Sequence, residues 1–420
     1  MARVFFRRVE VVGEERIPLA APIIFAANHP NGLIDPLVVL CFAPRTISFL
    51  AKAPLFRMPF VGWLVRAFGS IPVYRRQDRE ATSQNQETFA RARSVLGNGG
   101  SIAIFPEGTT HSEPRLLELK TGAARIALGS GMESGVSIVP AGLFYTEKQS
   151  FRSSAVLYFG DPIPVAAETL DESGEPRRES VEGLTMRIEG ALRELTLEAD
   201  SRAALHLVAR ASRIFSAGRG ELADELELQK RFVDGYGRLR ASDPVRLAAL
   251  ESRIERFAAE LGTARLEPEE LVPPTLAGSI RTILTLLILL PAAVAGGILH
   301  YPTYRLLGVT VKRFCREEEM AATMKTVGGL LLYPLTWIAL SLVAGSRLGP
   351  SYGACVFLVL PLLGYVSLRV FEQLDDVIGR ARALTWRVAR KQAYGRLLDE
   401  QRSIRNALIA LGEELQFAPM

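Results

Sequence analysis

A histidine and an aspartate near the start of the chain have the types and the order of a general base and its orienting partner. His29 and Asp35 lie in the run Asn-His-Pro-Asn-Gly-Leu-Ile-Asp-Pro at 28–36, directly after an apolar stretch at 23–27. Imidazole titrates near neutral pH and can take a proton from a hydroxyl, and a neighbouring carboxylate can hold the ring and stabilise its charged form. A helix cap and a turn would use the same residue types, so the pair alone is weak support for catalysis.

Two adjacent arginines, Arg75 and Arg76, could grip an anion. They follow the strand-like run Gly-Ser-Ile-Pro-Val-Tyr at 69–74. Guanidinium groups pair with phosphate through several hydrogen bonds at once. In isolation, the same pair would fit a solvated basic edge.

A third stretch, Phe-Pro-Glu-Gly-Thr-Thr at 105–110, follows another short apolar run. Glu107 and Gly108 at the end of a strand would form a tight turn, because glycine adopts backbone conformations that other residues avoid. Lys120 precedes a predicted helix, whose first N–H groups favour an anion. An ordinary strand-to-helix turn would have the same composition. His111 has no obvious partner in the sequence, and we expect it at the surface.

Alternating short strands and helices must position these residues. The apolar runs predict strands at 23–27, 101–105 and 136–139, and helical spacing predicts helices at 82–96 and 122–128. This alternation indicates an α/β fold, a layered sheet with flanking helices. A residue just after such a strand lies at the edge of the sheet, where a site can open.

Taken together and in order, the three stretches resemble the glycerol-phosphate acyltransferase superfamily, which includes the lysophosphatidate acyltransferases. The resemblance covers about residues 20–165 and closes with Ile-Val-Pro-Ala-Gly at 138–142. A looser resemblance, in Glu-Leu-Glu-Leu-Gln-Lys-Arg-Phe-Val-Asp-Gly-Tyr at 225–236, is to a subgroup similar to fungal glycerol-3-phosphate and dihydroxyacetone-phosphate acyltransferases. Members of that subgroup also carry C-terminal membrane segments.

The resemblance implies a role for each matching residue. His29 would be the general base and Asp35 its orienting partner. The other residues would bind the acceptor. Arg75 and Arg76 would contact its phosphate, and Lys120 would add positive charge nearby. The turn at Glu107, Gly108 and Thr109 would position its glycerol part, and Pro140 would shape the floor of the site.

The chain departs from the family pattern at two positions. Five residues separate His29 from Asp35, where the family usually has four, and Gly32 could absorb the extra residue in a bulge-like turn. Thr110 stands where the family often has arginine, so the pattern here lacks one phosphate contact that the family often has. Glycerol 3-phosphate, dihydroxyacetone phosphate and lysophosphatidate therefore all stay open as acceptors.

The implied reaction transfers a fatty acyl chain from acyl-CoA or an acyl-carrier protein to a hydroxyl. His29 would remove the hydroxyl proton during attack on the thioester, an assistance of roughly 10²–10⁴-fold. No Gly-x-Ser-x-Gly nucleophile elbow follows any of the predicted strands. We expect neither a metal nor a resident cofactor. The alternatives are a non-catalytic lipid-binding membrane scaffold and a lipid hydrolase or thioesterase.

Composition and charge favour a lipid partner over nucleic acid. The net charge is +5, and 48% of the residues are apolar. Residues 45–76 contain six basic and no acidic side chains, interleaved with aromatic and aliphatic ones. Such a mixture suits a membrane interface or an acyl channel, although a core with a basic rim would look similar. No recognition helix or stacking platform for nucleic acid is apparent, and the three cysteines lack metal-ligand spacing.

The chain divides into four predicted regions. The catalytic domain occupies 1–175, a helical connector 176–272, membrane segments 273–371, and a charged helical tail 372–420.

Three apolar segments, at 283–299, 327–345 and 355–368, are candidates for membrane helices. Pro291 interrupts the first, which we expect to be bent or re-entrant, with the other two forming a spanning hairpin. The link at 301–325 and the residues after 368 are rich in arginine and lysine, so both should be cytoplasmic. The N-terminus lacks the apolar core of a secretory signal. We therefore expect an integral membrane protein with its catalytic domain on the cytoplasmic side.

Overall fold

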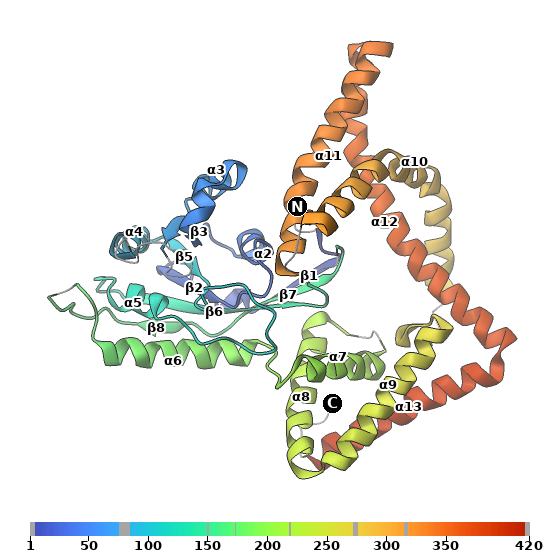
Figure 1. Cartoon of the computed structure of the whole chain (residues 1–420), viewed down its shortest axis with the longest axis horizontal. Helices are drawn as coiled ribbons and strands as arrows, with labels where there is room; N and C mark the ends of the chain where they lie inside the picture. Colours follow the sequence, from blue (N-terminus) through green and yellow to red (C-terminus); the bar gives the residue numbers. More distant parts are fainter. Residues whose placement is uncertain are drawn as a thin grey trace. The chain divides into compact units, whose positions relative to one another are not determined.

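The chain forms two compact units. The computed structural model describes residues 5–74, 85–148, 151–172, 174–217, 220–271, 276–314 and 318–415. Its contacts separate Met1–Glu198, which we name the sheet unit, from Ala199–Met420, which we name the helical unit. Figure 1 shows strands only in the first and long helices in the second.

The sheet unit is built on a mixed sheet that has eight strands within the described residues. Its order is β1-β7-β6-β2-β5-β3-β4, and β8 pairs with β6. The pairs of β2 with β5 and β6, of β3 with β4 and β5, and of β1 with β7 are parallel, whereas β6 is antiparallel to β7 and β8. The strands are β1 (Arg8–Val12), β2 (Ile23–Ala27), β3 (Ile47–Lys52), β4 (Ile71–Val73), β5 (Ser101–Ile104), β6 (Val136–Tyr145), β7 (Ser154–Phe159) and β8 (Ile163–Val165).

Helices cover both faces of this sheet. Every residue of β2 is buried, as expected for a central strand with a continuous apolar sequence. Figure 1 shows α5 and α6 on one side of the sheet and α2 on the other. The helices of this unit are α2 (Ile34–Phe42), α3 (Pro59–Ala67), α4 (Asn85–Gly97), α5 (Gly122–Leu128) and α6 (Arg178–Leu195). The layered α/β architecture predicted from the sequence is therefore present.

Helix α6 belongs to the sheet unit, although it falls within the predicted connector at 176–272. Its apolar stripe, which includes Leu184, Ile188 and Leu192, packs in one core with Ile102 and Ile138 of the sheet. The compact unit consequently extends to Glu198 rather than ending at 175. The helical spacing predicts an amphipathic helix but does not specify which surface its apolar face covers.

The segment predicted to meet a membrane interface forms β3, the 3-10 helix η2 (Ala53–Arg57) and α3. It divides between core and surface. Phe49 on β3 is buried, whereas Met58, Trp63 and Phe68 are 49%, 65% and 41% exposed. The exposed side chains sit in and beside α3, and their contact with lipid stays a prediction.

The helical unit joins the predicted connector to the predicted tail. Helices α7 (Arg202–Ser216), α8 (Leu222–Ser242), α9 (Pro244–Ala264) and α13 (Lys391–Glu414) pack together, and we name them the bundle. Its core unites Ile254 and Phe257 with Ile404 and Leu408. Arg253 on α9 also pairs with Glu400 on α13 at 2.6 Å. The tail is therefore not a separate region, because its apolar stripe needs the connector helices for burial.

Among the described residues, three helices are long and apolar enough to cross a membrane. The candidate spans are Thr282–Arg313, Thr323–Leu348 and Pro350–Ala389. They lie in α10 (Leu276–Phe314), α11 (Glu318–Leu348) and α12 (Pro350–Ala389), and α10 and α11 both pack against α12. Figure 1 shows α10 as two arms joined by a bend. Proline inside a helix removes a hydrogen bond and kinks it, and Pro291 lies within this helix.

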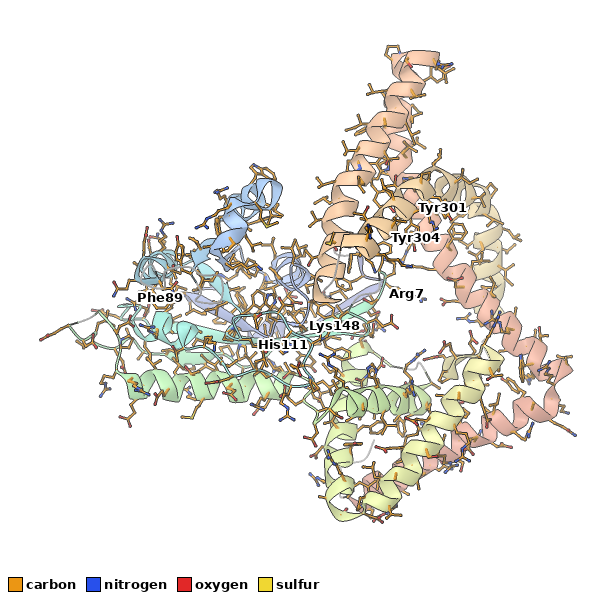
Figure 2. All side chains as sticks on the ribbon, in the orientation of Figure 1. Arg7, Phe89, His111, Lys148, Tyr301 and Tyr304 are labelled. Carbon is orange, nitrogen blue, oxygen red and sulfur yellow. The ribbon has the colours of Figure 1, made fainter. Side chains whose placement is uncertain are left out.

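Polar side chains join these apolar helices to one another. His300 on α10 accepts a hydrogen bond from the indole N–H of Trp337 on α11 at 2.9 Å. A Cβ placed on Gly364 of α12 would lie 3.0 Å from the same imidazole, so glycine allows close approach there. Tyr301 and Tyr304, which lie on α10 near His300, are exposed (Figure 2).

Candidate active site

The register of the sheet brings the predicted catalytic residues to one edge. Strands β2 and β5 are parallel neighbours, so their carboxyl ends lie side by side. His29 follows β2 by two residues, and Glu107 follows β5 by three. Pro140 on β6 pairs with Ala26 of β2 and is buried beside this edge.

The His29 ring contacts the Asp35 carboxylate. Nδ1 of His29 lies 2.8 Å from Oδ2 of Asp35, whose side chain is fully buried in the first turn of α2. A buried carboxylate accepts hydrogen bonds, so Nδ1 carries the proton and Nε2 is the nitrogen left to act as a base. Gly32, with φ of +45°, takes up the extra residue between the pair in a turn that glycine accommodates without strain.

Two more donors fix the Asp35 carboxylate. The Asn31 backbone N–H donates to Oδ2 at 2.7 Å, and the Tyr145 hydroxyl donates to Oδ1 at 2.6 Å. Burial, together with the Asp35 charge and hydrogen bond, raises the pKa of Tyr145 well above 10.0. The phenol therefore stays protonated and keeps donating. Tyr145 is not among the predicted site residues, because β6 extends beyond the predicted strand at 136–139.

The ring of His29 is also held by an aromatic stack. Its centroid lies 4.1 Å from that of Phe105, and the ring planes differ by 16°. The His29 side chain retains 17% exposure. The imidazole is thus held on its face and at Nδ1, and it remains partly accessible to a substrate.

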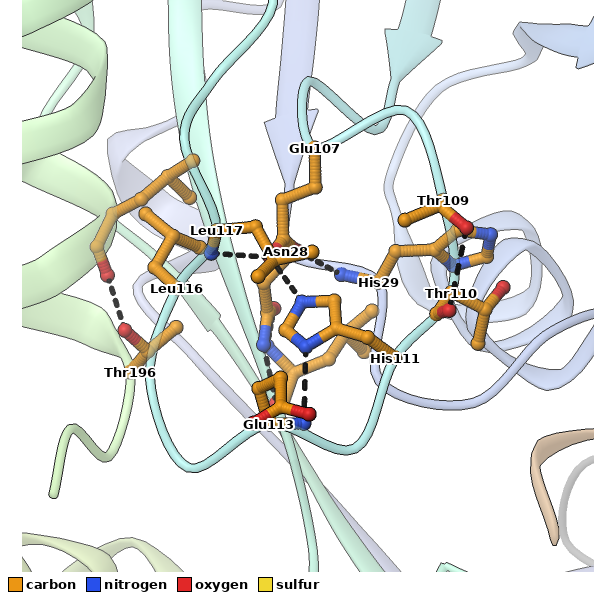
Figure 3. A network of polar contacts seen from close by, with 12 residues as sticks. Asn28, His29, Glu107, Thr109, Thr110, His111, Glu113, Leu116, Leu117 and Thr196 are labelled. Atoms are coloured by element: carbon orange, nitrogen blue, oxygen red, sulfur yellow. Dashed lines mark hydrogen bonds and ion pairs between the residues drawn. The ribbon is translucent and has the colours of Figure 1, made fainter. Parts of the chain in front are cut away.

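The Glu107 carboxylate faces donors from the protein itself. Oε1 accepts the His29 backbone N–H at 2.8 Å, and Oε2 accepts the Leu117 backbone N–H at 3.0 Å. Oε2 also pairs with Nε2 of His111 (Figure 3). Glu107 is 3% exposed. It therefore holds the backbone of the histidine loop, and its predicted contact with the glycerol of a substrate stays a prediction.

His111 is part of this network, so the expectation of a surface residue is wrong. Its side chain is 15% exposed, and its Nδ1 accepts the Glu113 backbone N–H at 3.2 Å. Its own backbone N–H donates to the His29 carbonyl at 3.3 Å. The imidazole proton is consequently on Nε2, directed at Glu107 (Figure 3). The only signal in the sequence is the four-residue separation of Glu107 from His111.

The remaining predicted residues surround this centre to different degrees. Gly108 adopts φ of +72° and forms the predicted tight turn. Lys120 is exposed, and its backbone N–H donates to the Pro106 carbonyl at 2.7 Å. Thr109 bonds weakly to the neighbouring Thr110 carbonyl at 3.4 Å.

Arg75 and Arg76 lie outside the described residues. The chain is described up to Tyr74, whose backbone N–H and carbonyl both bond to the Asn85 side chain at 3.0 and 2.8 Å. The roles of all predicted site residues, His29 and Asp35 included, stay predictions.

Comparisons with known proteins give the family that the sheet unit resembles. The family model described as Acyltransferase matches residues 8–143. Glycerol-3-phosphate O-acyltransferase 1 of Saccharomyces cerevisiae is 25% identical over 77% of this chain and 55% of its own length. The chloroplastic 1-acyl-sn-glycerol-3-phosphate acyltransferase LPAT1 of Arabidopsis thaliana is 28% identical over 34% of this chain and 38% of its own.

A solved structure also matches part of the chain. The 1-acyl-sn-glycerophosphate acyltransferase PlsC of Thermotoga maritima is 24% identical, covers 46% of this chain and 72% of its own, and has a TM-score of 0.34. The chain spans between 38% and 55% of the length of the fungal relatives it matches. Residues 8–143 thus match the acyltransferase family model, and the chain is similar to glycerol-3-phosphate and 1-acyl-sn-glycerol-3-phosphate acyltransferases.

Proposed function

We propose that this protein is an O-acyltransferase of phospholipid synthesis. It moves a fatty acyl chain from acyl-CoA or an acyl-carrier protein to a hydroxyl of glycerol 3-phosphate or 1-acylglycerol 3-phosphate. The observation that carries the proposal is the His29–Asp35 contact of 2.8 Å at the edge of the sheet in an acyltransferase domain.

In the proposed step, Nε2 of His29 takes the proton of the acceptor hydroxyl as its oxygen attacks the thioester carbon. Asp35 stabilises the imidazolium that forms. The tetrahedral intermediate then collapses, the carbon–sulfur bond breaks, and the departing thiolate receives the proton from His29. The proposal invokes no metal or resident cofactor, and the acyl thioester is a co-substrate. Base assistance of this type contributes about 10²–10⁴-fold.

Glycerol 3-phosphate is the acceptor favoured by the extent of the similarities. The two yeast glycerol-3-phosphate O-acyltransferases match 62% and 77% of the chain, which takes the match beyond the sheet unit. The 1-acylglycerol-3-phosphate acyltransferases of Arabidopsis thaliana and Borreliella burgdorferi match 34% and 33%. Arg75, Arg76 and Lys120 are the proposed phosphate contacts, since their cationic groups suit a phosphate.

The helical unit is the proposed membrane anchor. Its three apolar helices are long enough to span a bilayer and leave large aliphatic side chains exposed, such as Ile288, Leu342 and Leu358 at 77%, 68% and 69%. The proposal puts the sheet unit on the cytoplasmic side, where soluble thioester donors are made and where the basic links should lie.

The test is a panel of donors and acceptors with the full chain reconstituted in phospholipid nanodiscs. Products are identified by mass spectrometry for the wild type and for His29→Ala. We expect transfer by the wild type and a loss of about 10²–10⁴-fold in the variant. Unchanged transfer by His29→Ala would remove His29 as the base. No transfer with any donor would favour a lipid-binding scaffold, and acyl release to water without an acceptor would identify a hydrolase.

A further inference from the structure

An apolar pocket opens in the bundle of the helical unit. Residues of α7, α8, α9 and α13 line it, and it is partly open to solvent. Apart from Arg231 and the phenol of Tyr236, its lining consists of aliphatic residues, glycine and Phe232. Ligand pockets commonly have mostly apolar walls with a few polar groups.

Two glycines contribute to the hollow. Gly235 on α8 and Gly412 on α13 are both buried, and both line the pocket although they are far apart in the sequence. Glycine in the middle of a helix weakens that helix relative to alanine. Both helices therefore carry a residue unfavourable to helix formation at the wall of the pocket.

The proposed acyl transfer gives no role to one sequence feature, the run at 225–236, and part of this run lines the pocket. The run at 225–236 resembles the fungal subgroup, yet it lies on α8, outside the sheet unit that carries His29. Four of its residues line the pocket: Arg231, Phe232, Gly235 and Tyr236.

Arg231 supplies a cation at this apolar wall. Its neighbours on α8 are engaged, because Lys230 pairs with Glu227 at 2.9 Å and Arg238 pairs with Asp234 at 2.9 Å. Arg231 is exposed and has no ion pair within the part of the chain that the structure describes. The carboxylate of Glu414, near the pocket on α13, is already paired with Arg246 at 2.7 Å.

We propose that this pocket binds the acyl chain of a single-chain anionic lipid, with the lipid head group at Arg231. A flexible aliphatic chain suits walls of leucine, isoleucine and valine, and a guanidinium group suits a carboxylate or a phosphate. A free fatty acid and a 1-acylglycerol phosphate share this chemistry. The site is separate from the proposed catalytic centre and adds a second lipid contact to the proposed function.

The test uses photoreactive lipids with the full chain in phosphatidylcholine nanodiscs. The chain carries His29→Ala and no acyl thioester is added, so labelling reports binding in the absence of acyl transfer. The probes are palmitate and 1-palmitoylglycerol 3-phosphate, each with a diazirine in the acyl chain, and a matched neutral monopalmitoylglycerol. We expect crosslinks in peptides of α7, α8, α9 and α13, with the better anionic probe labelling about tenfold more than the neutral one, a difference of about 1.4 kcal/mol. The stronger anionic probe identifies which head group the site prefers.

Two pairs of variants separately test where the acyl chain and the lipid head group bind. Ala211→Phe fills the pocket and should lower labelling about tenfold, whereas Ala203→Phe, on the exposed side of the same helix, should leave it unchanged. Arg231→Gln should remove the preference for anionic probes, and Arg210→Gln, an exposed residue of α7 outside the pocket, should preserve it. The surface substitution at Arg231 keeps the test valid if Ala211→Phe fails to fold.

Three results would overturn the proposal. Crosslinks confined to the apolar helices α10, α11 and α12 would show that the probes meet only the membrane region. Labelling of the bundle that Ala211→Phe leaves unchanged in a folded chain would exclude the pocket. Equal labelling by the neutral probe would exclude an anionic ligand. Because no acyl thioester is present, a failure of the proposed reaction would not affect these readouts.

Discussion

At the scale of single residues, the Asp35 carboxylate determines which nitrogen of His29 can accept a proton. It receives hydrogen bonds from the imidazole, the Asn31 backbone and the Tyr145 hydroxyl. Asp35→Asn keeps the shape but offers an amide N–H where one of these donors needs an acceptor, and it removes the charge that stabilises the imidazolium. We expect kcat to fall by about 10²–10⁴-fold with little change in KM. A kcat within a factor of about three of the wild type would exclude Asp35 as the partner of the base.

His111 acts on the same histidine through Glu107 and through the backbone of His29. Its ring pairs with Glu107, whose Oε1 accepts the His29 backbone N–H, and its own backbone N–H donates to the His29 carbonyl. We expect His111→Leu to misplace the base and lower kcat by about 10²-fold. His111→Gln retains an N–H near the position of Nε2 and should recover most of the loss. Steady-state kinetics of both folded variants provide the measurement, and equal loss in the two would rule out the hydrogen bond as the cause.

The Tyr145 hydroxyl makes stability depend on pH at the alkaline end. Burial and Asp35 raise its pKa in the folded state above the ordinary value of 10.0. Its contribution is thus fully present below about pH 10, the unfolded pKa, and is lost as pH rises through the higher folded pKa. Thermal unfolding followed from about pH 8 to 11 should show a smaller alkaline decline for Tyr145→Phe than for the wild type. Identical declines would contradict this assignment.

At the scale of elements, the burial of α6 against the sheet tests whether this helix belongs to the sheet unit. Leu192 on α6 is fully buried in the core of the sheet unit, whereas Met186 on the same helix is 67% exposed. We expect Leu192→Ala to destabilise the sheet unit by about 2–5 kcal/mol. Met186→Ala should stay within about 0.5 kcal/mol of the wild type. Hydrogen exchange of the β2 and β5 peptides gives the measurement, and equal protection in both variants would mean that α6 is only a connector.

Sequence patterns predicted this fold where the signal is local. The continuous apolar run of β2 and the glycine turn after β5 led to the correct strand and the correct sheet edge, and hence to the His29–Asp35 contact. Partners brought in from elsewhere in the chain were missed. Tyr145 reaches Asp35 across 110 residues, and α13 meets α9 across about 147 residues at the Arg253–Glu400 pair. Periodicity defines the apolar face of an element but not the element that will cover it.

At the scale of the whole molecule, the length of α10 constrains how the chain can meet a bilayer. Its 39 residues would extend about 58 Å as a straight helix, at about 1.5 Å per residue. The hydrocarbon core is about 30 Å thick. A straight crossing would therefore carry Lys312 and Arg313 far beyond one surface or hold them within the lipid. Figure 1 shows a bend in α10, and we propose that its apolar first arm enters the membrane while its basic second arm stays near the cytoplasmic interface.

This arrangement predicts opposite accessibility for two positions of the helical unit. Lys312 and Ser351 are both exposed, the first near the end of α10 and the second at the start of α12. In a chain whose cysteines at 41, 315 and 355 are replaced by alanine, Ser351→Cys should react with a membrane-impermeant maleimide on intact cells. Lys312→Cys should react only after the membrane is permeabilised. The basic second arm of α10 should be held inside by its arginines and lysines, which translocate poorly. Labelling of Lys312→Cys on intact cells would require α10 to cross completely and would invert the predicted orientation of the α11–α12 hairpin.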